Sequence, residues 1–175
     1  MKENMIGVGI TRPIQELIIL RGVPGAGKST EVERLIGDGI VHSTDGIIEA
    51  TGDYFGFFTT MKETNNWGSL YRVHCENLEN AIASMVEGIS PVIIDNTNIK
   101  IKDFRAYVIE ALKLGYDEDN ITIVDIGTGG CTAEELAERN THGVPLSTIE
   151  KMIRSHQGIG VVTVEKIVKA QGGKL

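Results

Sequence analysis

Short, mostly apolar runs alternate along the chain with longer segments in which apolar residues recur at helical spacing. The runs lie at 17–20, 40–44, 91–95 and 121–126, and such runs are typical of strands that are covered on both faces. The segments between them are long enough for helices that cross from one strand to the next. This alternation predicts an α/β fold with a parallel sheet and helices on both faces.

Glycines and capping residues mark the expected ends of the helices. Gly37, Gly88 and Gly115 follow helical patterns, Asp103 is expected to cap a helix, and T-x-x-E and S-x-x-E boxes begin at Thr132 and at position 147. The predicted helices are 29–36, 70–87, 103–114, 132–140 and 147–157. The predicted inward faces comprise Leu70, His74, Cys75, Leu78, Ala81, Ile82 and Met85 in one helix, and Phe104, Tyr107, Val108, Ala111 and Leu112 in the next. Residues 46–68 favour no single element.

A glycine-rich loop directly follows the first apolar run. Residues 21–30 read RGVPGAGKST and contain the P-loop pattern G-x-x-x-x-G-K-S between a predicted strand and a predicted helix. Glycine permits close approach of the backbone to a ligand, so that loop amides can converge on phosphate oxygens. Lys28 would reach the β- and γ-phosphates, and the Ser29 hydroxyl would bind Mg²⁺. The predicted nucleotide-binding residues are Gly22, Val23, Pro24, Gly25, Ala26, Gly27, Lys28, Ser29 and Thr30.

Two absences favour transfer of the γ-phosphate over its hydrolysis. Asp95 ends the strand PVIID, where P-loop proteins commonly place a carboxylate near Mg²⁺, but the next residue is Asn96. Asparagine cannot take a proton from water, whereas motor ATPases commonly place a glutamate there. The chain also lacks an N-K-x-D segment that would read guanine.

Asp45 and Arg139 are candidate catalytic residues by position. Asp45 follows the second predicted strand, and the carboxyl ends of parallel strands open onto the ligand site, so its carboxylate could accept a proton from an attacking hydroxyl. Position alone leaves open that Asp45 caps the next segment. Arg139 follows a capped helix and could close over a triphosphate; the alternative is an arginine that favours the helix dipole.

Four segments in order resemble the polynucleotide kinase type of P-loop phosphotransferase, with its AAA_33-like kinase domain. They are RGVPGAGKST, HSTD, PVIIDNTN and RNTHGVP, the last followed by a helix with Met152. The likeness runs from about residue 17 to about residue 157, and the family includes phage and bacterial 5′-hydroxyl polynucleotide kinases. The resemblance implies a P-loop kinase domain over 15–157 with a helical lid at about 130–147. Residues 1–14 are expected to form an N-terminal arm closed by Pro13, and 158–175 an extension of uncertain structure.

The resemblance also implies roles for single residues. Lys28, Ser29 and Arg139 would bind ATP phosphates, and Ser29 and Asp95 would hold Mg²⁺. Asp45 matches the general base that activates a 5′-hydroxyl. The acceptor-binding residues would be Asp45, Asp95, Asn96 and Asn98. Several family members carry an acceptor-binding arginine three residues past the base, where this chain has Ile48.

Composition limits the kind of acceptor and the cellular compartment that we expect. The chain has 175 residues and a formal net charge of −7, which argues against broad wrapping of a polyanion. We expect a cytoplasmic protein with reduced cysteines, without a signal peptide or membrane span.

Aromatic residues cluster between 54 and 71 and could stack on bases, although a small packed core is the favoured interpretation. Lys100, Lys102 and Arg105 could line an acceptor path or lie at a solvated helix start.

Three readings of the function follow. The leading reading is an ATP- and Mg²⁺-dependent kinase of a 5′-hydroxyl in DNA or RNA. The second is a kinase of another hydroxyl, on a modified DNA base, a nucleoside or a small metabolite. The third is a nucleotide-dependent switch or adaptor without kinase activity.

Overall fold

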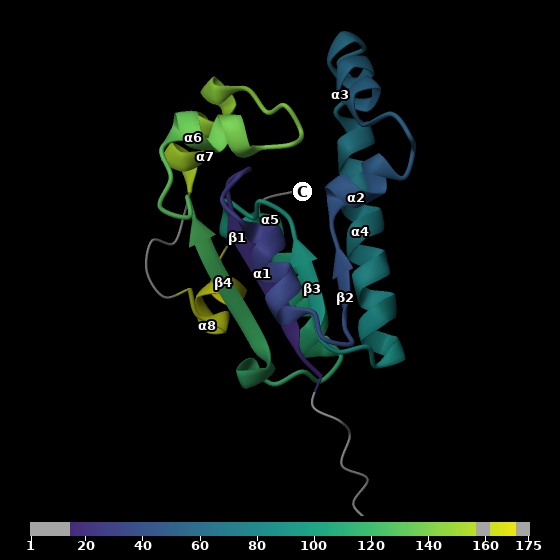
Figure 1. The fold of residues 1–175 in the computed structure, drawn as a ribbon. Coiled ribbons are helices and arrows are strands. Elements are labelled where there is room, and N and C mark those ends of the chain that lie inside the picture. The colour runs from purple at the N-terminus through teal and green to yellow at the C-terminus, as the bar shows by residue number, and fades with distance from the viewer. Residues whose placement is uncertain (1–14, 157–161, 171–175) are drawn as a thin grey trace, which may run out of the picture.

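The sheet carries the P-loop at one of its two ends. The computed structural model describes residues 15–156 and 162–170, so the predicted arm at 1–14 lies outside the described residues. Within them, parallel strands pair in the order β2–β3–β1–β4 (Figure 1). Their bounds are β1 Leu17–Gly22, β2 Ile40–His42, β3 Val92–Asp95 and β4 Ile121–Gly127. The predicted parallel α/β sheet is confirmed.

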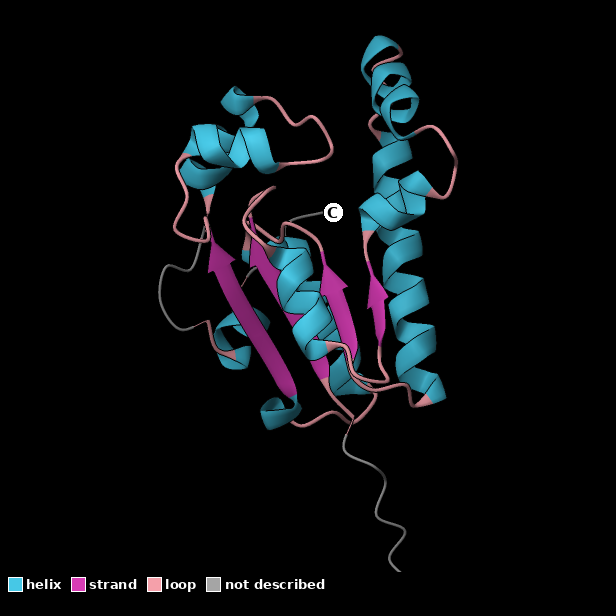
Figure 2. Ribbon diagram, viewed as in Figure 1, coloured by secondary structure: helices cyan, strands magenta, loops and turns pink. Residues whose placement is uncertain are grey.

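Helices cover both faces of this sheet (Figure 2). In chain order they are α1 Lys28–Leu35, α2 Thr44–Glu49, α3 Tyr54–Glu63, α4 Gly68–Glu87, α5 Ile101–Lys113, α6 Ala133–Arg139, α7 Leu146–Ser155 and α8 Val164–Lys169, with a 3-10 turn at Glu118–Asn120 before β4. Among the described helices, none combines the length and the apolar character that a membrane crossing requires.

The strands divide their side chains between two layers of core, as the period of two requires. Ile18, Leu20 and Ile93 pack against α1. Leu17 and Ile19 face the other side, where α4, α5 and α8 cover the sheet. A third cluster of buried residues joins the P-loop to α6 and α7. Because all strands are parallel, their carboxyl ends lie at one edge, beneath α6 and α7 and beside α2 (Figure 1).

The predicted inward face of α4 is wrong at His74, which is exposed. Two polar residues, Asn77 and Ser84, are buried instead because each has a partner. The Asn77 amide donates to the Tyr107 hydroxyl over 2.9 Å, and the Ser84 hydroxyl lies 2.9 Å from Nε2 of His42. A pattern of apolar residues cannot identify an inward face that hydrogen bonds complete.

Capping was predicted correctly at one box and wrongly at the other. The Thr132 box is confirmed, since Thr132 N donates to Glu135 and Glu135 N donates to Thr132. The box at Ser147 is wrong, because α7 begins after Pro145, whose carbonyl accepts from residues 148 and 149. Asp103 caps α5 from inside its first turn, by accepting from Lys100 N over 2.8 Å. The unassigned stretch 46–68 contains α2 and α3.

Strand β1 ends in a buried arginine that the sequence prediction did not include. Arg21 is 0% exposed, and its Nη1 lies 2.7 Å from Oδ2 of Asp125. Nε donates to the Asn98 carbonyl over 2.9 Å and Nη2 to the Ile99 carbonyl over 3.1 Å. Its guanidinium lies 5.2 Å from the centre of the Phe104 ring. Burial lowers the pKa of Arg21, and Asp125 opposes that shift. Arg21 therefore joins β1, β4 and the segment after β3 directly below the P-loop.

We predict that Arg21→Met destabilises the fold by about 3 kcal/mol. The substitution leaves buried carbonyls without donors and Asp125 without its partner, and loss of one member of a buried pair is strongly destabilising. Urea unfolding of both proteins measures the difference. Arg34→Met, which removes an exposed ion pair with Glu31 on α1, is the control and should leave the midpoint unchanged. An Arg21→Met midpoint equal to that of the control would contradict the assigned role.

Candidate functional site

The P-loop is held at its start by the two neighbouring strands. Gly22 N donates to the Thr97 carbonyl and Val23 N to the Gly127 carbonyl, both over 3.0 Å. Gly25 and Gly27 follow with φ of 79° and 99°, a left-handed backbone that favours glycine. The chain then enters α1 at Lys28. The segment 22–27 therefore has the strand–loop–helix geometry that places backbone amides at a helix N-terminus.

Helix α6 lies directly on this loop. A Cβ at Gly25 would come within 2.6 Å of the Leu136 carbonyl oxygen. Leu136 is fully buried in the cluster that also contains Val23, Ala26 and Ile149. The predicted lid at 130–147 thus contains α6 and the following loop, and α6 and α7 form a packed support for the P-loop.

The Lys28 ammonium lies against the backbone of the P-loop, at the end of the sheet where Asp45 and Asp95 also lie. Its Nζ donates to the carbonyls of Gly22 and Val23 over 3.1 and 3.4 Å. Burial lowers the pKa of Lys28, and the negative charges of Asp95 and Asp45 oppose this shift. The structure therefore brings together Lys28, Asp45 and Asp95, which the sequence analysis placed at the same edge of the sheet.

Asp95, at the end of β3, has the properties of a cation ligand. Its Oδ1 is buried and has no hydrogen-bond partner among the described residues. Burial raises the pKa of Asp95, as does the charge of Asp45, while Lys28 lowers it. A buried acceptor without a donor is costly, and Mg²⁺ binds through one or two carboxylates with phosphate and water oxygens. The residues present therefore fit Mg²⁺, although no cluster of three or more acidic, histidine or cysteine side chains exists within 15–156 and 162–170.

Asp45 lies in the first turn of α2, and its side chain is open to solvent. The cap of α2 is Ser43, whose Oγ accepts from Gly46 N over 2.9 Å, so the alternative that Asp45 caps this helix is wrong. The Asp45 side chain is 45% exposed. Tyr54 donates its hydroxyl to Oδ1 of Asp45 over 2.9 Å. The carboxylate is therefore oriented by a neighbour and still accessible to a substrate.

The two asparagines of DNTN have structural partners. Asn96 Oδ1 accepts from the backbone N and the hydroxyl of Thr44, over 2.9 and 3.0 Å, which joins β3 to the start of α2. Asn98 is 2% exposed, and its Nδ2 donates to the Leu20 carbonyl over 2.7 Å. A side chain this buried does not reach an acceptor, so the expectation that Asn98 binds the acceptor is corrected: it supports the strand below the P-loop.

Arg139 lies at the C-terminal end of α6, and Lys100 and Arg105 lie at or near the start of α5. Arg139, at the end of α6, donates from Nη1 to the Cys131 sulfur over 2.7 Å. Arg105 donates to the carbonyls of Ile167 and Val168 in α8, so it fastens α8 and does not line an acceptor path. Lys100 is the N-cap residue of α5, which agrees with a helix start.

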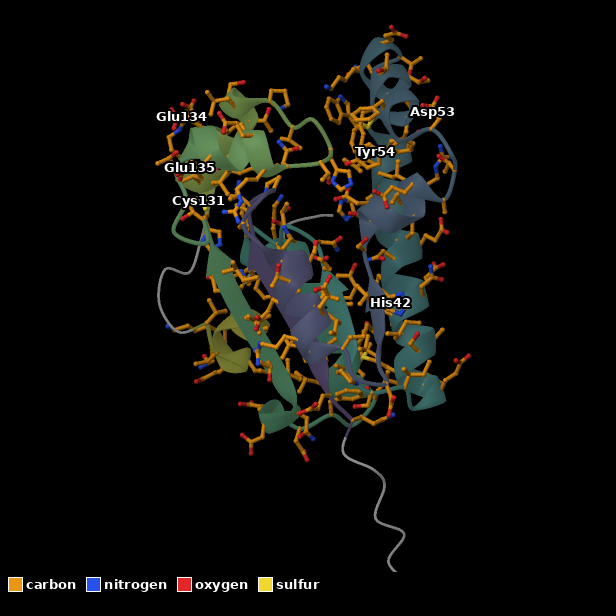
Figure 3. All side chains as sticks on the ribbon, viewed as in Figure 1. His42, Asp53, Tyr54, Cys131, Glu134 and Glu135 are labelled. Atoms are coloured by element: carbon orange, nitrogen blue, oxygen red, sulfur yellow. The ribbon has the colours of Figure 1, made fainter. Side chains whose placement is uncertain are left out.

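The aromatic stretch 54–71 divides into a packed group and an exposed group. The ring of Phe58 contacts those of Tyr54 and Phe57, as the packing interpretation expects. Three other rings are exposed, namely Phe55, Trp67 and Tyr71. Figure 3 labels Tyr54 on the side of α3 that faces α6 and α7, with Asp53 on the opposite side.

Two residues next to Asp45 were not predicted from the sequence. They are Tyr54 and His142. His142 lies in the loop after α6, and its Nδ1 is 3.8 Å from Oδ2 of Asp45. The signal that could have found His142 is its place in RNTHGVP, a segment that was used only for its resemblance. Tyr54 carries no such signal, because its role depends on how α3 packs.

Comparison with known proteins agrees with this geometry. The AAA domain family AAA_33 matches residues 17–159. The chain belongs to this family. Membership in AAA_33 makes the chain a P-loop domain of nucleotide-dependent, kinase-like character. NEDD4-binding protein 2 of Homo sapiens is 32% identical over 145 residues, which cover 81% of this chain and 8% of that protein. The chain thus spans a small part of this relative.

We predict that Gly25→Ala abolishes nucleotide binding and lowers the melting temperature. The new Cβ would overlap the Leu136 carbonyl, so the loop and α6 must separate. Gly37→Ala is the matched control, because Gly37 also has a positive φ, of 47°, but its Cβ would meet nothing within 4 Å. It should cost only the backbone strain, about 1 kcal/mol. Equal nucleotide affinity for Gly25→Ala and wild type, measured with a fluorescent ATP analogue, would contradict the packing described.

Proposed function

We propose that this AAA_33 domain transfers the γ-phosphate of ATP to a hydroxyl group, at a 5′ end of DNA or RNA. The observation that carries the proposal is the presence of a P-loop lysine and an accessible carboxylate at the same end of the sheet. Burial lowers the pKa of Lys28, and the negative charges of Asp95 and Asp45 oppose this shift. The Asp45 side chain is 45% exposed. A kinase needs such a carboxylate next to its phosphate-binding lysine.

The proposed reaction is an in-line displacement. The acceptor oxygen forms a bond to the γ-phosphorus while the bond between that phosphorus and the bridging oxygen of ADP breaks. The acceptor proton passes to the Asp45 carboxylate. Lys28 binds the β- and γ-phosphate oxygens together with the loop amides 22–30, and Arg139 contacts the transferred group. Mg²⁺, held by Ser29 and Asp95, would supply positive charge to the phosphates.

The surroundings of Asn96 support transfer over hydrolysis. Its amide oxygen accepts two hydrogen bonds from Thr44, and an amide cannot remove a proton from water. The switch or adaptor reading requires a group that activates water, and the position after Asp95 does not provide it. We therefore place that reading below the kinase.

One observation favours a second candidate acceptor. Ile48, three residues past Asp45, is 1% exposed, so this position cannot contact an acceptor phosphate. The nearby side chain of Glu49 is acidic, and no basic residue occurs between Asp45 and Lys62. An uncharged acceptor, such as the hydroxyl of a nucleoside or a hydroxymethylated base, fits these surroundings better than an end that carries phosphate.

An assay with ATP labelled at the γ-phosphate tests which molecule is the acceptor. The full chain is incubated with 5′-hydroxyl DNA and RNA oligonucleotides, duplexes that contain hydroxymethylated bases, nucleosides, and no acceptor. Labelled oligonucleotide ends support the first proposal, and labelled nucleosides or bases support the second. Release of inorganic phosphate alone, at the same rate with and without acceptors, overturns the kinase proposal.

Asp45→Asn should retain ATP affinity and reduce transfer by about 10²- to 10⁴-fold, the usual contribution of a general base. The asparagine keeps the size of the side chain but cannot take the proton. Initial rates with the best acceptor, together with ATP binding, measure the two effects. Asp38→Asn, at an exposed position before β2, is the control and should transfer at the wild-type rate. Wild-type transfer by Asp45→Asn would exclude Asp45 as the base.

Arg139→Ala should slow transfer by about 10³-fold, as loss of a transition-state arginine does in phosphoryl transfer. The alternative is that Arg139 matters only through its contact with Cys131, and a second variant tests it. Cys131→Ala removes the sulfur partner of Arg139 but keeps the guanidinium, so its transfer rate should remain close to that of wild type. If both variants lose activity equally, Arg139 acts only through its contact with Cys131.

A further inference from the structure

The loop between α6 and α7 crosses from the P-loop side of the site to the acceptor side. Figure 1 shows it reaching over the carboxyl ends of the strands toward α2 and α3. The loop has a fixed shape, because Asn140 Oδ1 accepts from Val144 N over 2.8 Å and Asn140 Nδ2 donates to the Ala137 carbonyl over 2.9 Å. Gly143, with a φ of 61°, completes the turn. The side chain at 142 is thereby directed outward from α6.

His142 contacts three residues on the acceptor side. Its Nε2 lies 2.8 Å from Oε1 of Glu49, and because a carboxylate only accepts hydrogen bonds, Nε2 carries the proton. Its ring stacks on Tyr54, with centroids 4.5 Å apart and planes at 25°. Its Nδ1 then faces Oδ2 of Asp45 at 3.8 Å, which is too long for a direct hydrogen bond.

Tyr54 completes the arrangement from the other side of the carboxylate. Its hydroxyl donates to Oδ1 of Asp45 over 2.9 Å. Burial raises the pKa of Tyr54, and the charge of Asp45 raises it further, so the hydroxyl remains a donor at neutral pH. One carboxylate oxygen is thus occupied, and Oδ2 is left for an acceptor hydroxyl.

We propose that His142 and Tyr54 are positioning residues for Asp45, and that His142 is the latch that joins the α6–α7 loop to α2 and α3. Tyr54 orients the carboxylate so that Oδ2 faces the acceptor. The latch makes the position of this loop depend on the bond to Glu49 and the stack on Tyr54. The catalytic part of this inference rests on the proposed kinase function.

Three variants separate the contacts. Tyr54→Phe keeps the ring under His142 and removes the donor to Asp45. His142→Ala removes both the bond to Glu49 and the stack. His142→Gln retains an amide donor that can reach Glu49, and should recover part of the lost function. Thr141→Ala, at an exposed position in the same loop, is the matched control.

Hydrogen exchange of the backbone amides tests the latch without any acceptor. We expect His142→Ala to increase exchange by about tenfold in both 140–145 and 44–54, since loss of the contact releases both sides. Thr141→Ala and Tyr54→Phe should exchange like wild type in 140–145. Faster exchange in 140–145 alone, with 44–54 unchanged, would overturn the latch.

Kinetics with the identified acceptor test the positioning role. Tyr54→Phe should lower kcat by about 10- to 100-fold, the cost of a misplaced catalytic group, with KM for ATP unchanged. His142→Ala should lower kcat and also raise the share of phosphate that passes to water, because the loop no longer excludes it. A Tyr54→Phe kcat within about twofold of wild type overturns the positioning role. If the wild-type chain phosphorylates no acceptor, the kinase proposal fails together with the catalytic part, while the exchange result still decides whether the latch exists.

Discussion

The electrostatic interaction of the half-buried Lys28 ammonium with the carboxylates of Asp95 and Asp45 is the interaction on which the site depends. The pKa of Lys28 is lowered by burial, and that of Asp95 is raised by burial. Each charge is costly to bury alone, and each opposes the shift of the other. A triphosphate with its divalent cation would supply both missing partners, anionic oxygens for Lys28 and positive charge for Asp95. The site is therefore electrostatically suited to a nucleotide that carries a metal ion.

This arrangement is possible because the strand ends below it are held rigidly. Arg21 joins β1 to Asp125 in β4 and to the carbonyls that follow β3. Asn98 adds a bond to the Leu20 carbonyl, and α6 packs on Gly25 from above. Arg21 and Asn98 are polar side chains that would be unusual inside a sheet. They occur where the P-loop and the segments at the ends of β3 and β4 must keep a fixed spacing. Precise placement of a phosphate-binding loop is what phosphoryl transfer requires of a protein.

Local patterns predicted the four strands and the P-loop, because burial on both faces and glycine-rich turns leave direct signals in the sequence. Asp45 and Asp95 were proposed in the same way, from their positions at the ends of strands. Arg21 and Tyr54 could not be predicted, since their roles depend on tertiary packing, whereas His142 lies in RNTHGVP, a segment that was used only for its resemblance. Asn98 shows the converse: its motif implied a ligand contact, but its side chain is buried. The arrangement of α2 and α3 also depends on tertiary packing, which explains why 46–68 gave no clear pattern.

The central claim is that a γ-phosphate bound by the P-loop faces the Asp45 carboxylate across the space where a hydroxyl can enter. A crystal structure of the chain with ADP, Mg²⁺ and aluminium fluoride, a planar mimic of the transferred phosphoryl group, tests it most directly. The account predicts the mimic between Lys28 and Asp45, with a carboxylate oxygen of Asp45 about 2.6–3.2 Å from the apical oxygen ligand opposite ADP. An apical ligand directed away from Asp45, with another side chain in hydrogen-bond contact with it, would contradict the account.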